Sequence, residues 1–420
     1  MFSSFCHSYP LVAKVNKKKT NTIYFVSVFR LFLRFYVSLE IKNIKMRNKI
    51  FGSLILISLL ISCNKKGNTS SGNEADTVSY RVNYAEMFRV NRFPDYTEVQ
   101  VRDPWDTTRL LQKYILIPKT SSLPASLPEG TVVRTPLSRV AVYSSVHCSM
   151  LAQLGNLSDI AGVCESRYII IPEIMRGVSE GKIIDLGESY APDIEKIIDL
   201  NPGAIISSPF QNMGYGKVEK LGIPIIEGVD YMETTPLGRA EWIRFLGLFF
   251  GKESLSDSIF EKTERSYLTL KEKVENVSKR PTVVSEMKTG PVWYVPGGNS
   301  YMARLFADAG ADYFWKDVPQ TGSLSLSFEA VFDKAQQADF WLVKYNRDRN
   351  MTLDDLRKDY AANANFKAFK DKNVWGSNSA KVPFYEEVPL HPDYLLRDFI
   401  LIFHPDLLPG DTLRYFNLLK

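Results

Sequence analysis

The segment Asp193–Phe210, DIEKIIDLNPGAIISSPF, decides the fold class of this chain. Its first half spaces apolar side chains as an amphipathic helix does, and Asn-Pro-Gly then makes a turn. The apolar run that follows is short and bounded by serine and proline, which is typical of a buried strand. A helix joined by a tight turn to a buried strand is the repeating unit of a parallel sheet covered by helices.

The same alternation of strand and helix occurs on both sides of that segment. Nearby it is found in RVAVYSS (139–145), VHCSMLAQLG (146–155), IAGVCES (160–166) and KVEKLGIPIIEG (217–228). It returns later in PTVVSEM (281–287), FADAGADYFW (306–315), FEAVFDKAQQADFWLVKY (328–345) and FKDKNVWGS (369–377). Two such series predict two α/β units, each with a parallel sheet.

The segment between the two series, residues 236–280, has no proline after Pro236 and predicts one long helix. Ahead of the first series, YTEVQVRD (96–103) alternates polar and apolar residues, as a half-exposed strand does. The expected fold is α/β, with two Rossmann-like lobes whose central sheets are flanked by helices. We assign a small N-terminal β layer to residues 78–138, the N-terminal lobe to 139–235, the long interdomain helix to 236–280 and the C-terminal lobe to 281–420.

Inside the N-terminal region, a stretch that begins at Met46 has the features of a protein's N-terminus. Arg47 and Lys49 precede the apolar run Ile50–Ile61, and Ser62-Cys63 closes it. The run is shorter than the about 20 apolar residues that a transmembrane helix needs, and it is typical of a signal peptide. Its end resembles a lipobox, which predicts a lipoprotein signal peptide over 46–62 and lipidation of Cys63; a buried apolar helix is the alternative. Residues 1–45 are then a spurious or removed extension, and the polar segment 63–77 is a flexible tether.

The positive charge of the chain lies in this leader. Residues 1–62 hold ten Lys/Arg and one Glu, so the net charge of +5 becomes −4 without them. Nucleic acid is therefore not an expected partner. Outside the leader and Cys63, the cysteines are Cys148 and Cys164. Their pairing stays open at this point, since an exported protein permits either a disulfide or two separate core thiols.

Specific local sequences add a family resemblance. They are YSSVHCSMLAQLG (143–155), DIEKIIDLNPGAIISS (193–208), VWYVPGGNSYMARLFADAGADYFW (292–315), LSFEAVFDKAQQADFWLV (326–343) and VPLHPDYLLRDFILIFHP (388–405). In this order, from about Val140 to Pro405, the chain resembles the substrate-binding proteins of iron-siderophore, haem and cobalamin ABC importers. The N-terminal layer is similar to a Bacteroidetes-type subgroup. The resemblance implies a ligand between the lobes, at the carboxyl ends of the strands.

The resemblance also implies one acidic docking residue on each lobe, which pairs with arginines of the permease. The matching positions are Glu195 and Glu329. Each stands at the start of a predicted helix, where the helix dipole favours a carboxylate in any case. Ordinary solvated glutamates are therefore the alternative.

Ligand-binding side chains are expected in the loops that follow the strands. The N-lobe candidates are Ser144, Ser145, His147, Arg167, Tyr168, Phe210 and Gln211, and the C-lobe candidates are Lys288, Trp293, Tyr294 and Tyr385. Aromatic rings offer area to a large chelate, and cationic groups neutralise its acidic periphery. Core packing is the alternative for each aromatic residue. For His147, a capping or packing role is favoured over contact with a ligand.

Catalytic and metal motifs are lacking in the sequence: it has no GxSxG, P-loop, HExxH or paired-Cys zinc pattern. The expectation is therefore a non-enzymatic binding protein without a cofactor or a directly bound metal. It would take up an iron chelate, or alternatively cobalamin or haem, and deliver it to an inner-membrane ABC permease with its ATPase. We expect a monomer, lipid-anchored in the periplasm of a Gram-negative bacterium. A surface-exposed capture lipoprotein and a metal- or tetrapyrrole-handling enzyme are the alternatives.

Overall fold

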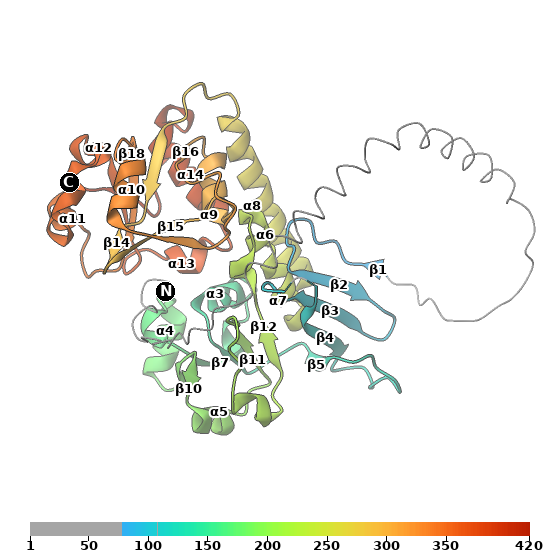
Figure 1. Cartoon of the computed structure of the whole chain (residues 1–420). Helices are drawn as coiled ribbons and strands as arrows, with labels where there is room; N and C mark the ends of the chain where they lie inside the picture. Colours follow the sequence, from blue (N-terminus) through green and yellow to red (C-terminus); the bar gives the residue numbers. More distant parts are fainter. Residues whose placement is uncertain (1–77, 107) are drawn as a thin grey trace, which may run out of the picture. The chain divides into compact units, whose positions relative to one another are not determined.

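The computed structural model describes residues 78–106 and 108–420 (Figure 1). The predicted extension, the signal peptide, the tether and Cys63 lie outside these residues. Within them, no helix combines the length and the apolar character needed to cross a membrane.

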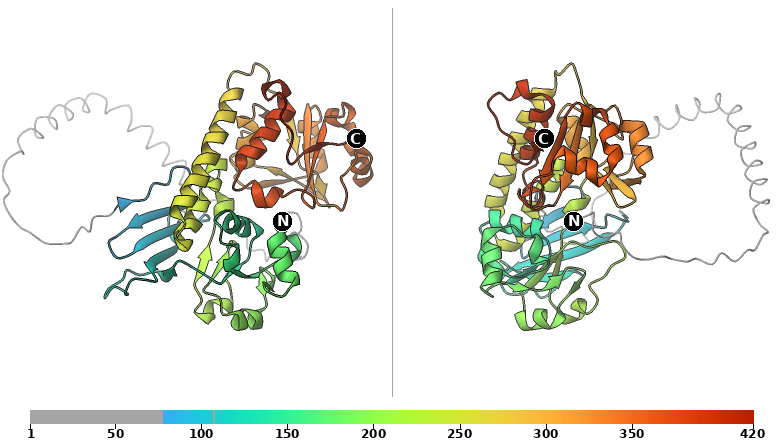
Figure 2. Two further views of the ribbon diagram at one scale, coloured as in Figure 1. Left: turned by 180° about the vertical axis from the view of Figure 1, so that it is seen from behind. Right: turned by 90° about the vertical axis from the view of Figure 1, so that its left-hand side faces the viewer.

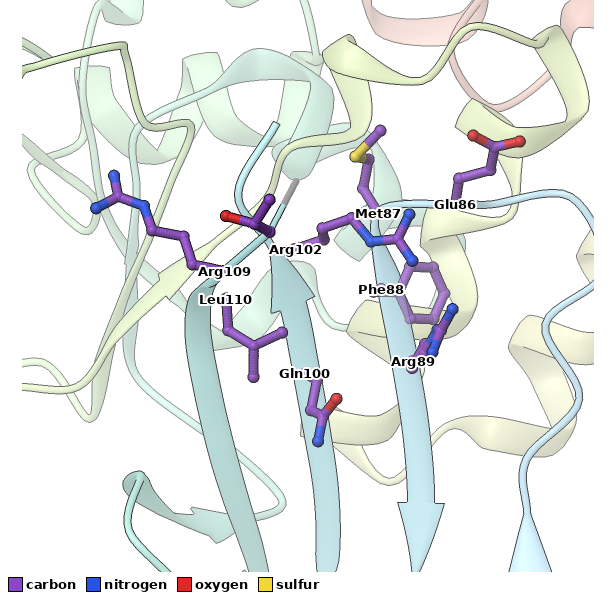
Figure 3. Close-up of a pocket in the computed structure, with 9 residues that line it drawn as sticks. Glu86, Met87, Phe88, Arg89, Gln100, Arg102, Arg109 and Leu110 are labelled. Atoms are coloured by element: carbon purple, nitrogen blue, oxygen red, sulfur yellow. The ribbon is translucent and has the colours of Figure 1, made fainter. Parts of the chain in front are cut away.

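The N-terminal β layer is a five-stranded sheet in the order β1-β2-β3-β4-β5. Its strands are β1 (Val78–Ser79), β2 (Phe88–Arg92), β3 (Thr97–Arg102), β4 (Leu110–Pro118) and β5 (Thr131–Thr135). All neighbours are antiparallel except β4 and β5. Phe88, Val101 and Tyr114 point to the face that packs on the first linking helices, as the alternation in YTEVQVRD predicts. A pocket opens at one end of the layer, where β2 and β4 begin and β3 ends (Figure 3).

The N lobe is built on a five-stranded sheet in the order β12-β11-β6-β7-β8, and every strand pair in it is parallel. The strands are β6 (Val140–Val142), β7 (Ile160–Val163), β8 (Ile184–Asp185), β11 (Ala204–Ser207) and β12 (Ile225–Glu227). The lobe also contains the hairpin β9 (Gly187–Glu188) with β10 (Ala191–Pro192), and the helices α3 (Ser145–Gln153), α4 (Pro172–Ser179) and α5 (Ile194–Leu200). In the opening segment, Asp193 caps α5 and Asn201 ends it with a positive φ of 44° before β11. The parallel sheet confirms the predicted fold class.

The linking region differs from its prediction. Instead of one helix over 236–280, the chain forms α6 (Pro236–Ala240), α7 (Trp242–Phe250) and α8 (Glu253–Val274). Gly251 ends α7 because it takes a left-handed φ of 62°, which glycine adopts at low cost. Every residue of α7 is buried, whereas α8 buries one stripe of side chains at spacings of three and four: Ser256, Phe260, Thr263, Tyr267, Leu270 and Val274. That stripe lies along α7 and α14 (Pro392–Phe403) (Figure 2).

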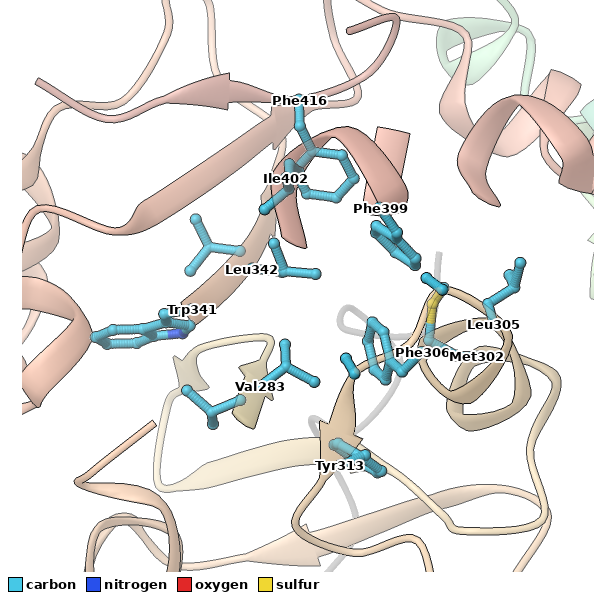
Figure 4. Close-up of a cluster of buried hydrophobic side chains, with 14 of the residues drawn as sticks. Val283, Met302, Leu305, Phe306, Tyr313, Trp341, Leu342, Phe399, Ile402 and Phe416 are labelled. Atoms are coloured by element: carbon cyan, nitrogen blue, oxygen red, sulfur yellow. The ribbon is translucent and has the colours of Figure 1, made fainter. Parts of the chain in front are cut away.

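The C lobe has a main sheet in the order β16-β13-β18-β19-β20, parallel except for β20. Its strands are β13 (Thr282–Ser285), β16 (Asp312–Tyr313), β18 (Phe340–Tyr345), β19 (Val374–Asn378) and β20 (Asn417–Leu418). A smaller antiparallel sheet contains β14 (Lys288–Thr289), β15 (Val292–Pro296) and β17 (Ser323–Leu326). Around them lie α9 (Tyr301–Asp308), α10 (Phe328–Ala335), α11 (Leu353–Asp359), α12 (Lys367–Lys370), α13 (Phe384–Glu387) and α14. Figure 4 shows part of the core, where the rings of Phe306 and Phe399 pack 5.2 Å apart and Trp341 lies to one side of them.

Residues Tyr80–Met87, which we call the strap, fasten the β layer to the linking helices. The buried Glu241 carboxylate accepts the backbone N–H groups of Asn83, Tyr84 and Ala85 at 2.7–3.1 Å. Glu233 accepts the N–H of Met87 at 3.0 Å and the indole N–H of Trp242 at 3.0 Å. Because the β layer and the N lobe also share one hydrophobic cluster, the two are packed as a single body.

Candidate functional site

Exposed aromatic side chains follow the strands of the N-lobe sheet. Tyr168 comes after β7 and is 42% exposed, and Phe210 comes after β11 and is 48% exposed. Tyr231 follows β12, and its ring lies 6.4 Å from that of Phe210. Since β7, β11 and β12 run parallel, their carboxyl ends meet at one edge of the sheet. This edge therefore offers a surface of aromatic rings, with the exposed Gln211 beside Phe210.

Arg167 supplies a cation at the same edge. Its guanidinium lies 4.6 Å from the centre of the Tyr168 ring and forms a two-fold ion pair with Glu188, with Nη2 to Oε2 at 2.9 Å. Hydrogen bonding to Glu188 raises the pKa of Arg167 above its ordinary value. An acidic ligand would have to share this guanidinium with Glu188.

The loop after β6 is less accessible than the sequence predicts. Ser144 caps α3 through its hydroxyl, which accepts the N–H of Val146 at 3.3 Å, and Ser145 is buried. His147 is only 2% exposed, and its Nε2 lies 3.1 Å from Oδ1 of Asp230. The packing alternative for His147 is therefore the one that the structure supports.

Asp230 connects that histidine to the linking helices. Its other carboxylate oxygen accepts a hydrogen bond from Nε of Arg239 on α6 at 3.1 Å. Burial alone would raise the pKa of Asp230, but His147 and Arg239 lower it below its ordinary value. Arg239 in turn lies over the ring of Tyr301 at 5.1 Å, at the start of α9 in the C lobe. A charged network thus runs from α3 of the N lobe to α9 of the C lobe.

The C-lobe aromatics differ from the prediction. Trp293 is fully buried, donates its indole N–H to the carbonyl of Ser285 at 3.0 Å and stacks on Trp341 at 5.5 Å. It is the second residue of β15, on the face that packs into the core, and a ligand does not reach it. Tyr294, the next residue along the strand, is half-buried on the opposite face. The assignment of Trp293 to the ligand site is therefore corrected.

Lys288 and Tyr385 remain accessible. The ammonium group of Lys288 lies 4.8 Å from the centre of the Tyr360 ring and donates to the carbonyl of Gly290 at 2.5 Å. Tyr385 on α13 is 41% exposed. Helix α13 packs on α3 of the N lobe, so Tyr385 stands where the two lobes meet.

A second ion pair lies at the carboxyl ends of the C-lobe strands. Nζ of Lys344, near the end of β18, lies 2.7 Å from Oε1 of Glu286, which directly follows β13. Burial lowers the pKa of Lys344, but Glu286, Tyr385 and Tyr301 together raise it above its ordinary value. The lysine is therefore charged at neutral pH and is held in place by its partner.

The two predicted docking residues occupy comparable places. Glu195 lies in the first turn of α5 and Glu329 in the first turn of α10, and both are exposed. A hydrogen bond from its own backbone N–H and one from Ser327 lower the pKa of Glu329. Both carboxylates are available to a partner.

Sequence reasoning missed two groups of residues: Asp230, Arg239 and Tyr301, which join the lobes, and the C-lobe ion pair of Glu286 with Lys344. Asp230 and Glu286 could have been found, because each follows a predicted strand as the named candidates do. Arg239 and Tyr301 carry no such mark in the sequence. They stand on helices whose relative placement depends on how the two lobes pack.

Two further expectations concern cysteines and metals. Cys148 and Cys164 are free, buried thiols, and burial raises the pKa of each. In the part of the chain that the structure describes, no group of three or more His, Cys, Asp or Glu side chains is arranged to hold a metal ion.

A model of the periplasmic binding protein family matches residues 140–379, which span both lobes and the linking helices. The chain belongs to this family. An uncharacterized lipoprotein of Methanocaldococcus jannaschii is 29% identical to this periplasmic binding protein over 325 residues, or 73% of this chain and 75% of that one. The petrobactin-binding protein YclQ of Bacillus subtilis is 28% identical over 158 residues, or 37% of this chain and 48% of that one.

Solved structures show the same fold. The TroA-like periplasmic binding protein FepB of Veillonella parvula superposes with a TM-score of 0.53 at 17% identity, covering 69% of this chain and 96% of that one. An ABC-type Fe3+-hydroxamate transport protein of Saccharomonospora viridis gives 0.50 at 17% identity, covering 64% and 94%. The family resemblance and the two-lobed α/β fold are thereby confirmed. The Bacteroidetes-type subgroup stays a prediction.

Proposed function

We propose that this periplasmic binding protein is the substrate-binding component of an ABC importer, and that its ligand is an iron chelate of the ferric siderophore class. The observation that carries the proposal is the N-lobe sheet edge, where Tyr168, Phe210 and Arg167 follow parallel strands and remain exposed. Ligands of open α/β sheets bind at such edges. Two curated relatives from Bacillus subtilis are named for petrobactin and for iron uptake, which supports an iron-related ligand.

Ligand capture in this proposal is non-covalent. The rings of Tyr168 and Phe210 supply apolar area from the N lobe, and Tyr385 supplies it from the C lobe. Arg167 and Lys288 attract an acidic chelate, the first while it is paired with Glu188. Glu195 and Glu329 then orient the loaded protein on arginines of the permease, since exposed charges at a rim direct encounter more than they add affinity.

Binding assays with the full chain test this function. Quenching of tryptophan fluorescence would be followed with a ferric hydroxamate, a ferric catecholate, haem and cyanocobalamin, beside mass spectrometry and the absorbance spectrum of the protein as purified. We expect the tightest binding for a ferric chelate, and Phe210→Ala or Tyr385→Ala to weaken it about tenfold, because a well-placed aromatic contact contributes roughly 1–2 kcal/mol.

Tyr96→Ala is the matched control, because Tyr96 stacks on Phe93 at 4.6 Å in the turn of the β layer, away from both strand-end surfaces. If Phe210→Ala and Tyr385→Ala bind the ligand as tightly as the wild type does, the ligand does not bind at the proposed surface. Tighter binding of haem or cyanocobalamin than of the ferric hydroxamate and the ferric catecholate would assign that tetrapyrrole as the ligand in place of a ferric siderophore.

The location proposed for the protein is the periplasmic side of a membrane, held there by lipid on Cys63. The lipoprotein relatives in Methanocaldococcus jannaschii support this proposal. We expect Cys63→Ser to move the protein from the membrane fraction to the soluble fraction, as judged by fractionation and by the mass of the N-terminal peptide. A Cys63→Ser protein that stays with the membrane would contradict lipid anchoring.

A further inference from the structure

The pocket of the β layer lies outside the region that the family model matches. It has a volume of about 210 Å³ and is lined by Glu86, Met87, Phe88, Arg89, Gln100, Arg102, Thr108, Arg109 and Leu110. Pockets for drug-sized ligands measure about 300–1,000 Å³, so this one accepts only a small group. Any ligand held here differs from the large chelate proposed for the two lobes.

Strand register places two arginines on one face of this pocket. Arg89 of β2 pairs with Gln100 of β3, and the N–H of Arg102, two residues on, donates to the carbonyl of Met87 at 2.8 Å. Arg89 and Arg102 are therefore diagonal cross-strand neighbours, a spacing that long side chains bridge. Figure 3 shows Arg89 and Arg102 toward one end of the pocket and Arg109 toward the other.

Neither of these two guanidinium groups has a side-chain partner among the described residues. The nearby acids are engaged elsewhere: Asp103 with Arg109 at 2.8 Å, and Glu98 with Lys113 at 3.2 Å. Glu86 lines the pocket but forms no ion pair with either arginine in the described chain. Gln100 and Thr108 already donate to Glu98 and Asp106. The free donors of the pocket are thus the guanidinium groups.

We propose that this pocket binds a phosphate group, clamped between Arg89 and Arg102. Guanidinium groups match the oxygens of phosphate in pairs, and such charge-assisted hydrogen bonds are about twice as strong as neutral ones. An anion there also relieves the repulsion between two like charges on neighbouring strands. The phosphate could belong to a free anion or to the phosphodiester of a lipid headgroup, and the test separates the two.

Calorimetric titration of the full chain in an uncharged detergent tests the proposal, with inorganic phosphate and glycerophosphoglycerol as probes. We expect the wild type to bind one equivalent of at least one probe, and Arg89→Gln and Arg102→Gln each to weaken binding about tenfold or more. Tighter binding of glycerophosphoglycerol assigns the site to lipid headgroups, and tighter binding of inorganic phosphate assigns it to a free anion.

The control variant is Arg265→Gln, since Arg265 is an exposed arginine on α8, and it should bind as the wild type does. Arg89→Lys keeps the charge but not the paired donors, so it should retain only part of the affinity. The proposal would be overturned if neither probe binds, if Arg89→Gln binds the probes as tightly as the wild type does, or if chloride binds as tightly as the probes. Because none of these residues lies on the lobes, ligand binding by the lobes is expected to be unaffected.

Discussion

The two lobes are built from the same strand–helix units, yet they use their aromatic residues differently. In the N lobe, Tyr168 and Phe210 stand beyond the ends of strands and remain exposed. In the C lobe, Trp293 and Trp341 stand inside strands and stack in the core. The position of a ring relative to the strand end therefore decides whether the ring is exposed or buried in the core, and residue type alone does not.

The largest effect that would test this comparison concerns docking, where the lobes are expected to act alike. Glu195→Ala combined with Glu329→Ala should abolish uptake and leave ligand affinity unchanged. In our proposal both exposed carboxylates contact the permease, and neither contacts the ligand. Each single variant should reduce uptake by a similar factor. Cellular uptake of labelled ligand and titration of the purified protein measure the two quantities.

Glu261→Ala, on the exposed side of α8, controls for the loss of a surface charge. If the double variant loses ligand affinity instead, the two glutamates belong to the ligand site and the docking assignment fails.

The second effect concerns stability and should differ between a variant in the N lobe and one in the C lobe. Trp293→Ala should lower the free energy of unfolding by about 3–5 kcal/mol, because it removes a fully buried ring and leaves a cavity. Phe210→Ala should change it by no more than about 0.5 kcal/mol, since that ring is half exposed. Urea denaturation followed by circular dichroism measures both. Similar losses in the two variants would contradict the distinction between core and surface aromatics.

The smallest effect depends on pH and concerns the network between the lobes. Since His147 and Arg239 hold the pKa of Asp230 below its ordinary value, the charged carboxylate stabilises the fold above about pH 4. That stability is lost as the pH falls through the lowered pKa. Asp230→Asn should therefore cost about 1–3 kcal/mol at pH 7 and progressively less below pH 4.

Urea denaturation at pH 7 and at several values below pH 4 gives this dependence, with the exposed Asp411→Asn as the control. A difference between wild type and Asp230→Asn that stays constant over the whole range would show that Asp230 keeps an ordinary pKa.

Much of the fold could be predicted from the sequence because its periodicity is local. The unit at 193–210 and its repeats have the right order, and both parallel sheets follow from them. The break at Gly251 was missed, since a glycine inside an apolar helical pattern can stay helical or end the helix. The tertiary packing of α7 and α8 determines which occurs.

The candidate site could be predicted only in part. The exposure predicted for Tyr168, Phe210 and Tyr385 is observed, and their contact with a ligand stays a prediction. Trp293 was misassigned because β15 begins one residue before it, at Val292, and places its ring inward. Arg239 and Tyr301 could not be found, since their meeting depends on the contact between α6 and α9.

The strap is hydrogen-bonded to residues on both sides of the break at Gly251. Glu233 and Glu241, which bind it, both precede Gly251, on the N-lobe side of the linking helices. Tyr80 and Tyr84 of the strap also donate their hydroxyl groups to Asp257 and Glu264 of α8, which follows Gly251. A change in the angle between the lobes that moved α7 against α8 would therefore have to break hydrogen bonds of the strap, which acts as a brace across Gly251.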